Sequence, residues 1–143
     1  MKKVFTQNDI PLVAAELLLA VSQNIQATVI ALSGDLGAGK TTLTQAIARA
    51  LGVTESLQSP TFVIMKRYET SHDVYGQLIH MDAYRLSGKE ELEKLGWNEW
   101  VMDPKTLIVI EWPEQVPGLL SVNAHTVSLR HISENEREIE LPI

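Results

Sequence analysis

The sequence contains no cysteine, which excludes a disulfide framework and any thiolate metal site. It also lacks an uninterrupted apolar run long enough to cross a membrane as a helix, so we expect no membrane partner. The basic start at Met1–Lys3 is followed by polar residues and Pro11, a pattern that does not fit a secretory signal peptide. These absences favour a cytoplasmic protein. A chain of 143 residues is long enough to form one domain, residues 1–143, with its own core.

Basic residues are also scarce. The chain has 12 Lys and Arg against 18 Asp and Glu, which gives a formal net charge of −6. A protein that binds nucleic acid on its own surface usually has a basic face, because neutralising phosphates supplies most of the affinity. The composition therefore predicts that this chain contacts RNA or DNA only indirectly, through a partner.

The strongest positive signal lies between residues 28 and 52. An apolar run, Thr28–Ser33, leads into a glycine loop with the spacing G-x-x-x-x-G-K-[ST], which runs from Gly34 to Thr41. A pattern of helical period follows from Lys40 to Leu51 and ends at Gly52. The sequence thus predicts a strand, a phosphate-binding loop and a helix.

Each position of this loop has a physical reason. Glycines at 34, 37 and 39 allow backbone dihedrals at which successive N–H groups turn inward around an anion. The free N–H groups and the dipole at the start of the helix also favour negative charge there. We expect Lys40 to reach the β- and γ-phosphates and the Thr41 hydroxyl to contact a magnesium ion.

The other patterns predict an α/β fold, a P-loop NTPase-like three-layer sandwich whose mixed sheet has a parallel core and antiparallel hairpins. The expected elements are a helix from about residue 8 to 23, a hairpin of strands Phe62–Tyr68 and Gln77–Asp82, a helix Ser87–Leu95 capped by Ser87 and Glu90, a buried strand Thr106–Glu111, and a hairpin of Thr126–Arg130 and Arg137–Leu141. The residues expected to face inward are Leu12, Val13, Leu17, Leu18, Val21 and Ile25 in the first helix, and Leu43, Ile47, Ala50 and Leu51 in the second.

Two carboxylates at strand ends compete for the magnesium ion. Glu111 closes a wholly apolar strand, which we expect to lie beside Thr28–Ser33 at the edge where ligands bind in open sheets. Glu111 is therefore assigned to the magnesium shell with Thr41, and both Lys40 and Glu111 are expected to act in catalysis. Asp82 ends a strand nearer the sheet edge and is the candidate for orienting the attacking water or signalling the phosphate state. His80 on that strand is expected to be an ordinary buried histidine.

Two other segments have open interpretations. Ser59 and Thr61 are either sensors of the γ-phosphate or plain turn residues ahead of a strand. Residues 5–10 either cap the first helix or fold near a nucleotide base.

Five motifs together resemble the bacterial TsaE (YjeE) family over nearly the whole chain. They are Gly34–Thr42, Ser59–Phe62, His80–Leu86, Glu90–Glu93 followed by Gly96, and Ile110–Pro113. The resemblance implies a small P-loop protein that binds ATP and Mg²⁺ and hydrolyses ATP slowly. It implies that the protein acts with the TsaD and TsaB subunits, which install threonylcarbamoyl on adenosine 37 of tRNAs reading codons that begin with A. The protein itself would not transfer the group.

The resemblance also assigns residues. Thr41 and Glu111 match the family's magnesium positions, and Gly37, Ala38, Gly39, Lys40, Thr41 and Thr42 match its phosphate-binding run. Trp112 matches a residue tied to nucleotide binding, and base contacts are implied near Ile10 and Arg137.

Two other functions remain open. A small-molecule or nucleotide kinase of this fold usually has an arginine-rich lid, but this chain has five scattered arginines and no long insertion. The other possibility is a binding module whose bound nucleotide controls a partner, while hydrolysis is incidental.

Overall fold

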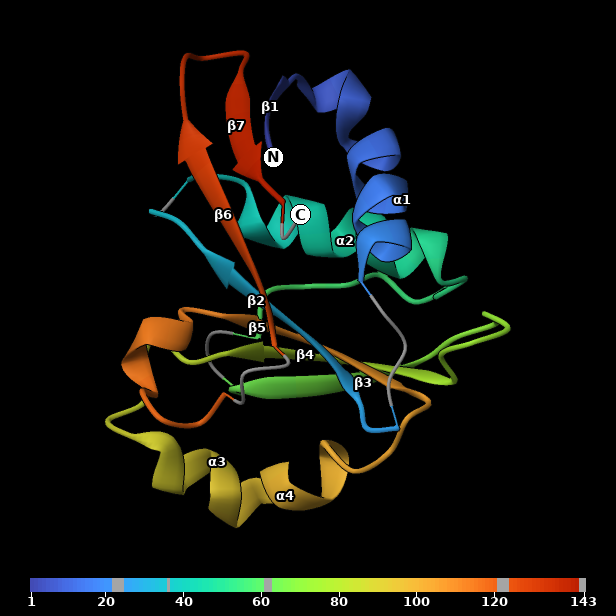
Figure 1. Cartoon of the computed structure of the whole chain (residues 1–143), viewed down its shortest axis with the longest axis vertical. Helices are drawn as coiled ribbons and strands as arrows, with labels where there is room; N and C mark the ends of the chain where they lie inside the picture. The colour runs from blue at the N-terminus through green and yellow to red at the C-terminus, as the bar shows by residue number, and fades with distance from the viewer. Residues whose placement is uncertain (22–24, 36, 61–62, 121–123, 142–143) are drawn as a thin grey trace.

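The structure is a computed structural model that describes residues 1–21, 25–35, 37–60, 63–120 and 124–141. The strands are β1 (Lys2–Phe5), β2 (Thr28–Ser33), β3 (Met65–Glu69), β4 (Gln77–Asp82), β5 (Thr106–Glu111), β6 (His125–His131) and β7 (Arg137–Glu140). The helices are α1 (Ile10–Ala20), α2 (Lys40–Ala50), α3 (Lys89–Leu95) and α4 (Trp97–Trp100), with short 3-10 helices η1 (Gln7–Asp9) and η2 (Pro113–Gln115) (Figure 1).

The seven strands form one mixed sheet in the order β1-β7-β6-β2-β5-β4-β3. The four central strands, β6, β2, β5 and β4, run parallel, while β1, β7 and β3 pair antiparallel with their neighbours. All six residues of β5 are buried, as its unbroken apolar run predicts for a strand covered on both faces. The expected parallel core and both antiparallel hairpins are confirmed.

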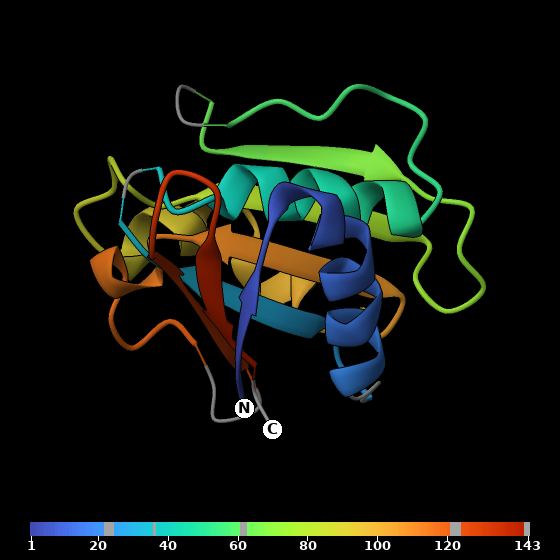
Figure 2. The ribbon, with the colours of Figure 1, turned by 90° about the horizontal axis from the view of Figure 1, so that it is seen from above.

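Helices cover both faces of this sheet. Helices α1 and α2 pack together over one face, and α3 and α4 lie on the other (Figures 1 and 2). The first core contains Leu17, Ile47 and Val109, and the second contains Met81, Ile108 and Trp97. The face of β6 opposite the first core is exposed at Ser128 and Arg130, so the third layer covers only part of the sheet.

The first helix differs from its prediction. A 3-10 turn precedes it, with Asp9 accepting hydrogen bonds from the Thr6 backbone and hydroxyl at 2.9 and 3.1 Å, and the helix ends at Ala20 instead of residue 23. The extended backbone of Val21 (φ −84°, ψ 135°) ends it early. Two residues expected to face inward, Leu12 and Ile25, are 56 % and 92 % exposed.

Local details also differ in three later elements. Ala50 is exposed and Ala46 is buried instead, because the inward stripe of α2 passes through Leu43, Ala46 and Ile47. Strand β3 begins at Met65 instead of Phe62, after Ile64 adopts a left-handed backbone (φ 71°).

Helix α3 begins at Lys89, two residues later than predicted. The cap ahead of it uses Glu91 in place of Glu90, since the Ser87 amide and hydroxyl both donate to Glu91 Oε1 at 2.8 and 2.5 Å.

Strand β1 has no counterpart among the predicted elements. This strand pairs with β7, and Met1 and Leu141 exchange backbone hydrogen bonds of 3.3 and 2.9 Å between their amino and carbonyl groups. The two ends of the described chain therefore lie together (Figure 1). Among the described residues, no helix combines the length and apolarity that a membrane crossing requires.

Candidate functional site

The predicted phosphate-binding loop joins β2 to α2 at the carboxyl edge of the parallel strands. Gly39, with φ of 100°, directly precedes α2, and its carbonyl accepts the Leu43 amide at 2.9 Å. Only a residue without a Cβ adopts this backbone without strain, and it turns the chain so that the first amides of α2 face the loop. The loop has the local geometry that an anion site at a helix start requires.

Gly34 fits the loop against the neighbouring strand. Its φ is 152°, and a Cβ placed on it would lie 2.6 Å from the Leu129 carbonyl oxygen of β6. The glycine at this position is therefore required by a close backbone approach as well as by its dihedral angle.

Lys40 folds back over this loop. Its ammonium group donates to the Gly34 carbonyl, lies 3.4 Å from the Asp35 carbonyl oxygen and sits 3.7 Å from the centre of the Trp112 ring. Burial lowers the pKa of Lys40, while the negative charges of Glu111, Glu114, Asp82 and Asp35 oppose that shift. The ammonium is thus held between backbone carbonyls and the Trp112 ring, with acids nearby.

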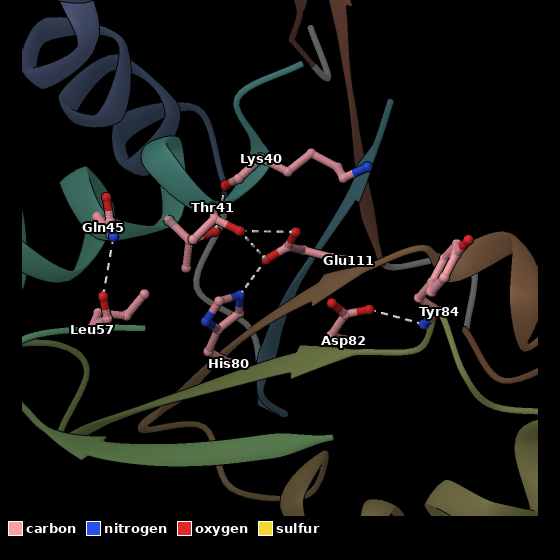
Figure 3. A network of polar contacts seen from close by, with 9 residues as sticks. Lys40, Thr41, Gln45, Leu57, His80, Asp82, Tyr84 and Glu111 are labelled. Carbon is pink, nitrogen blue, oxygen red and sulfur yellow. Dashed lines mark hydrogen bonds and ion pairs between the residues drawn. The ribbon is translucent and has the colours of Figure 1, made fainter. Parts of the chain in front are cut away.

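Thr41 and Glu111 meet across the edge of the sheet, as predicted. The Thr41 hydroxyl lies 3.4 and 3.3 Å from Oε1 and Oε2 of Glu111, whose side chain is almost fully buried (Figure 3). On the other side, His80 Nε2 lies 2.5 Å from Glu111 Oε2. The carboxylate is therefore held between the first turn of α2 and the middle of β4.

Asp82 lies one strand away from Glu111. The two residues are register partners of β4 and β5, and Figure 3 shows both side chains at the same strand ends. Asp82 is buried, and its Oδ1 accepts the Tyr84 amide at 2.9 Å, which fixes one carboxylate oxygen. The structure thus places both predicted strand-end acids beside the loop.

Trp112 directly follows Glu111 and has a left-handed backbone (φ 58°), which is uncommon for a large residue. Its ring supports the Lys40 ammonium and lies 5.0 Å from the Tyr84 ring, centre to centre. This turn brings the indole back over the phosphate loop, so Trp112 lies next to the predicted phosphate contacts.

A cavity of about 580 Å³ lies on the other side of the loop. Its walls come from the segment between β1 and α1, the loop and first turn of α2, and the turn between β6 and β7. The predicted residues among its lining are Ile10, Ala38, Gly39, Thr42 and Arg137. The Arg137 guanidinium donates to the Ser133 and Glu136 carbonyls at 2.8 and 3.0 Å, which holds that wall in place.

The predicted site residues therefore form two adjoining groups. Lys40, Thr41, Asp82, Glu111 and Trp112 gather at the strand ends, and the cavity residues lie beyond the loop. Gly37 belongs to the loop between them (φ 80°), and the predicted Thr61 lies outside the described residues.

Sequence reasoning missed the contact of His80 with Glu111 and the cavity wall at Glu134 and Asn135. No local pattern marks His80 as a neighbour of Glu111, because that contact depends on the register of β4 against β5. No local pattern marks Glu134 and Asn135, which reach the cavity only through the β6–β7 turn.

Comparison with known proteins identifies the family. A family model described as "Threonylcarbamoyl adenosine biosynthesis protein TsaE" matches residues 6–139. Proteins named tRNA threonylcarbamoyladenosine biosynthesis protein TsaE are 38 % identical over 78 % of this chain in Bacillus subtilis, 35 % over 89 % in Haemophilus influenzae and 37 % over 80 % in Treponema pallidum. The matches span 66 %, 77 % and 81 % of those proteins, so the match covers just under two thirds of the Bacillus relative.

A solved structure has the same fold. The crystal structure of Bacillus subtilis YdiB superposes with a TM-score of 0.74 and 28 % identity, covering 97 % of this chain and 82 % of that one. With a family model that spans most of its length and relatives of this similarity, the chain belongs to the TsaE family of threonylcarbamoyl adenosine biosynthesis proteins.

Proposed function

We propose that this protein binds ATP together with Mg²⁺ and hydrolyses the ATP slowly, as an accessory subunit in tRNA threonylcarbamoyladenosine synthesis. The observation that carries the proposal is the junction of the phosphate loop with the Thr41–Glu111 contact at the carboxyl edge of the central strands. A glycine loop at a helix start suits the phosphates, and an adjacent buried acid suits a cation that accompanies them.

The donor set fits magnesium. A hydroxyl and a carboxylate are hard oxygen ligands, and Mg²⁺ usually takes one or two protein ligands beside substrate phosphates and water. Among the described residues, no cluster of three or more His, Cys, Asp or Glu side chains could hold a metal by itself, which suits an ion that arrives with a nucleotide. Thr41 and Glu111 would hold the ion, whose chemistry there is to neutralise charge on the β- and γ-phosphate oxygens.

The chain's own residues supply the other steps. The amides of Gly37 to Thr42 would bind the phosphates, and Lys40 would leave the Gly34 carbonyl to pair with their oxygens. Asp82 has Oδ1 held by the Tyr84 amide and lies beside Glu111, so its carboxylate is positioned to orient an attacking water.

The cavity is the proposed base site. Its volume lies in the range of small-molecule pockets, and it adjoins the loop through Ala38, Gly39 and Thr42. Ile10 supplies an apolar wall, and Arg137 supplies a planar guanidinium that the β6–β7 turn already fixes. A nucleotide with its phosphates on the loop would direct its base into this space.

The placement of the arginines favours hydrolysis over a kinase. Arg67 stacks near Trp100, Arg130 pairs with Glu138 at 3.2 Å, and Arg49 borders a groove at the far end of α2. Arg137 lines the base cavity, so only Arg85, just after β4, follows a strand end that faces the loop. A kinase clamp on the transferred phosphate needs several such cations together.

The proposed partners are the TsaD and TsaB subunits, and tRNA would be held by them. The relatives named above carry the name of tRNA threonylcarbamoyladenosine biosynthesis, and the net charge of −6 disfavours direct binding of RNA by this chain. In this arrangement the nucleotide state of the chain would act on its partners, and the transfer of the threonylcarbamoyl group would occur elsewhere.

The test combines binding and turnover. Calorimetry with ATP should show binding that strengthens with Mg²⁺, and phosphate release should be slow and rise when TsaD and TsaB are added. Glu111→Ala should abolish magnesium-dependent hydrolysis, whereas Glu99→Ala, an exposed acid on α4, should not.

Three results would count against the proposal. They are no heat with ATP and Mg²⁺, unchanged turnover in Glu111→Ala, or phosphate transferred to an added acceptor in place of water. A pull-down with and without ATP would show whether TsaD and TsaB are retained, and a tight salt-sensitive complex of the isolated protein with tRNA would contradict the indirect role of RNA.

A further inference from the structure

We infer that His80 is a positioning residue: it fixes the Glu111 carboxylate so that one chosen oxygen faces the cation. The inference rests on the proposed function, because it needs Glu111 to be a magnesium ligand. It assigns to β4 a role in metal affinity that the phosphate-loop motif does not contain.

The first observation is the contact itself. His80 is fully buried in β4 on the side of the sheet that faces α2, and Nε2 lies 2.5 Å from Glu111 Oε2 (Figure 3). A carboxylate accepts hydrogen bonds, so the ring nitrogen in this contact is the donor. A hydrogen bond this short to a charged acceptor is among the stronger polar contacts in proteins.

The second observation is the division of the two carboxylate oxygens. In the described part of the chain, Oε2 contacts both His80 and Thr41, whereas Oε1 contacts only the Thr41 hydroxyl, at 3.4 Å. Because His80 occupies Oε2, the oxygen left for a cation is Oε1, which lies about as close to the Thr41 hydroxyl as Oε2 does. Without the ring, rotation about the side-chain torsion next to the carboxylate would make the two oxygens equivalent.

The third observation is the other ring nitrogen. His80 Nδ1 is buried and has no hydrogen-bond partner among the described residues. A histidine kept only for packing would normally satisfy both nitrogens or be replaced by an apolar residue, because an unpaired buried polar atom costs stability. Within the described ranges, the polar contact of this ring is the one with Glu111, which supports a role at the site.

Partners that orient a ligating carboxylate typically contribute about 10- to 100-fold to metal affinity. The test uses two neutral variants of different reach. The amide nitrogen of His80→Gln extends about as far as Nε2, and that of His80→Asn only as far as Nδ1, so only the glutamine can restore the bond to Glu111. Met81→Leu is the matched control, since Met81 is the next residue of β4, equally buried, and faces the opposite core.

The affinity for a non-hydrolysable ATP analogue is measured once with EDTA and once with Mg²⁺. The ratio of these two affinities is the magnesium gain. Mn²⁺ binding in the presence of the analogue, followed by electron paramagnetic resonance, gives a second value. We expect His80→Asn to lower the magnesium gain and the Mn²⁺ affinity by about 10-fold or more while the affinity in EDTA stays unchanged. His80→Gln and Met81→Leu should keep both values.

An unchanged magnesium gain in His80→Asn would overturn the inference, as would an equal loss of affinity with and without the ion, which indicates a structural role. A wild-type protein with no magnesium gain at all would instead refute the metal assignment, and the inference with it.

If His80→Asn fails to fold, the inference can still be tested on the wild-type protein and on Glu111→Gln. Nuclear magnetic resonance should show a solvent-protected proton on His80 Nε2, displaced in Glu111→Gln. Absence of that proton would overturn the inference.

Discussion

Replacing Gly34 by alanine should destabilise the protein strongly, even though it adds a single methyl group. The residue lies where β2 ends and the phosphate loop begins, with φ of 152°. Its added Cβ would lie 2.6 Å from the Leu129 carbonyl oxygen and 3.3 Å from the Ala38 Cβ. Backbone atoms of β6 cannot rotate away as a side chain can, so either the loop or the strand must shift.

Two costs combine at this position. Holding a residue with a Cβ in this backbone region costs about 1–3 kcal/mol, and forcing an extra methyl group into packed surroundings costs about 1–3 kcal/mol. The sum, about 2–6 kcal/mol, is a large part of the roughly 5–15 kcal/mol by which domains of this kind are stable. It corresponds to a fall in Tm of roughly 6 to 20 °C for a chain of this length.

Two other glycines separate these costs. Gly37 also has a positive φ (80°) but nothing lies within 4 Å of its added Cβ, so Gly37→Ala should lose only about 1–2 kcal/mol. Gly76 has neither feature, and Gly76→Ala should stay within about 0.5 kcal/mol of the wild type. Urea unfolding without nucleotide gives all three values, and a Gly34→Ala variant as stable as Gly76→Ala would refute the reasoning.

Two further predictions concern the ammonium in the loop and the acidic caps. Lys40→Met should weaken ATP binding about 10- to 150-fold, because hydrogen bonds to a charged group contribute about 1.5–3 kcal/mol; calorimetry measures this, and an unchanged affinity would remove Lys40 from the site. Hydrogen bonds from Thr6 lower the pKa of Asp9, and those from Ser87 lower the pKa of Glu91, so the unfolded chain binds these protons more tightly than the folded one. Their stabilisation is present at neutral pH and is lost as the pH falls below the ordinary pKa of each group, about 4.5 for Glu91 and 3.8 for Asp9. Tm measured against pH should therefore decline less steeply on acidification for the Asp9→Asn, Glu91→Gln double variant than for the wild type, and identical slopes would contradict this explanation.

The central strands were predictable because a strand that is buried on both faces has an almost wholly apolar sequence. Thr28–Ser33 and Thr106–Glu111 read as unbroken apolar runs, and the structure pairs them in parallel. Their pairing brought Glu111 to Thr41, as the glycine spacing and the strand-end acid together indicated. The parts that could be predicted are those in which one local pattern fixes both the element and its neighbour.

Strand β1 could not be predicted in this way. Its sequence, Lys2–Phe5, carries two lysines, and it becomes a strand only by pairing with β7 at the other end of the chain. Helix α1 is a second example, because the spacing of Leu12 and Ile25 fits a buried helix that reaches residue 23, although both residues are exposed and the helix ends at Ala20. Tertiary contacts decide such short or terminal segments, and a local window does not contain them.

The contact of His80 with Glu111 required knowledge of register. His80 pairs with Val109, two residues before Glu111, so its ring reaches the carboxylate diagonally across two parallel strands. A histidine within a strand gives no indication of such a neighbour until the alignment of β4 and β5 is fixed.

The two halves of the proposed nucleotide site rest on parts of the fold with different origins. The phosphate half stands on β2, β5 and the start of α2, where Glu111 is buried and paired strands on both sides hold the backbone. The base half is built from the segment after β1 and from the β6–β7 turn, which the pairing of β1 with β7 brings together. A ligand that spans both halves would stabilise the pairing of β1 with β7, because binding favours whichever state completes the site. Nucleotide binding would therefore be coupled to the order of the sheet edge that β1 and β7 form.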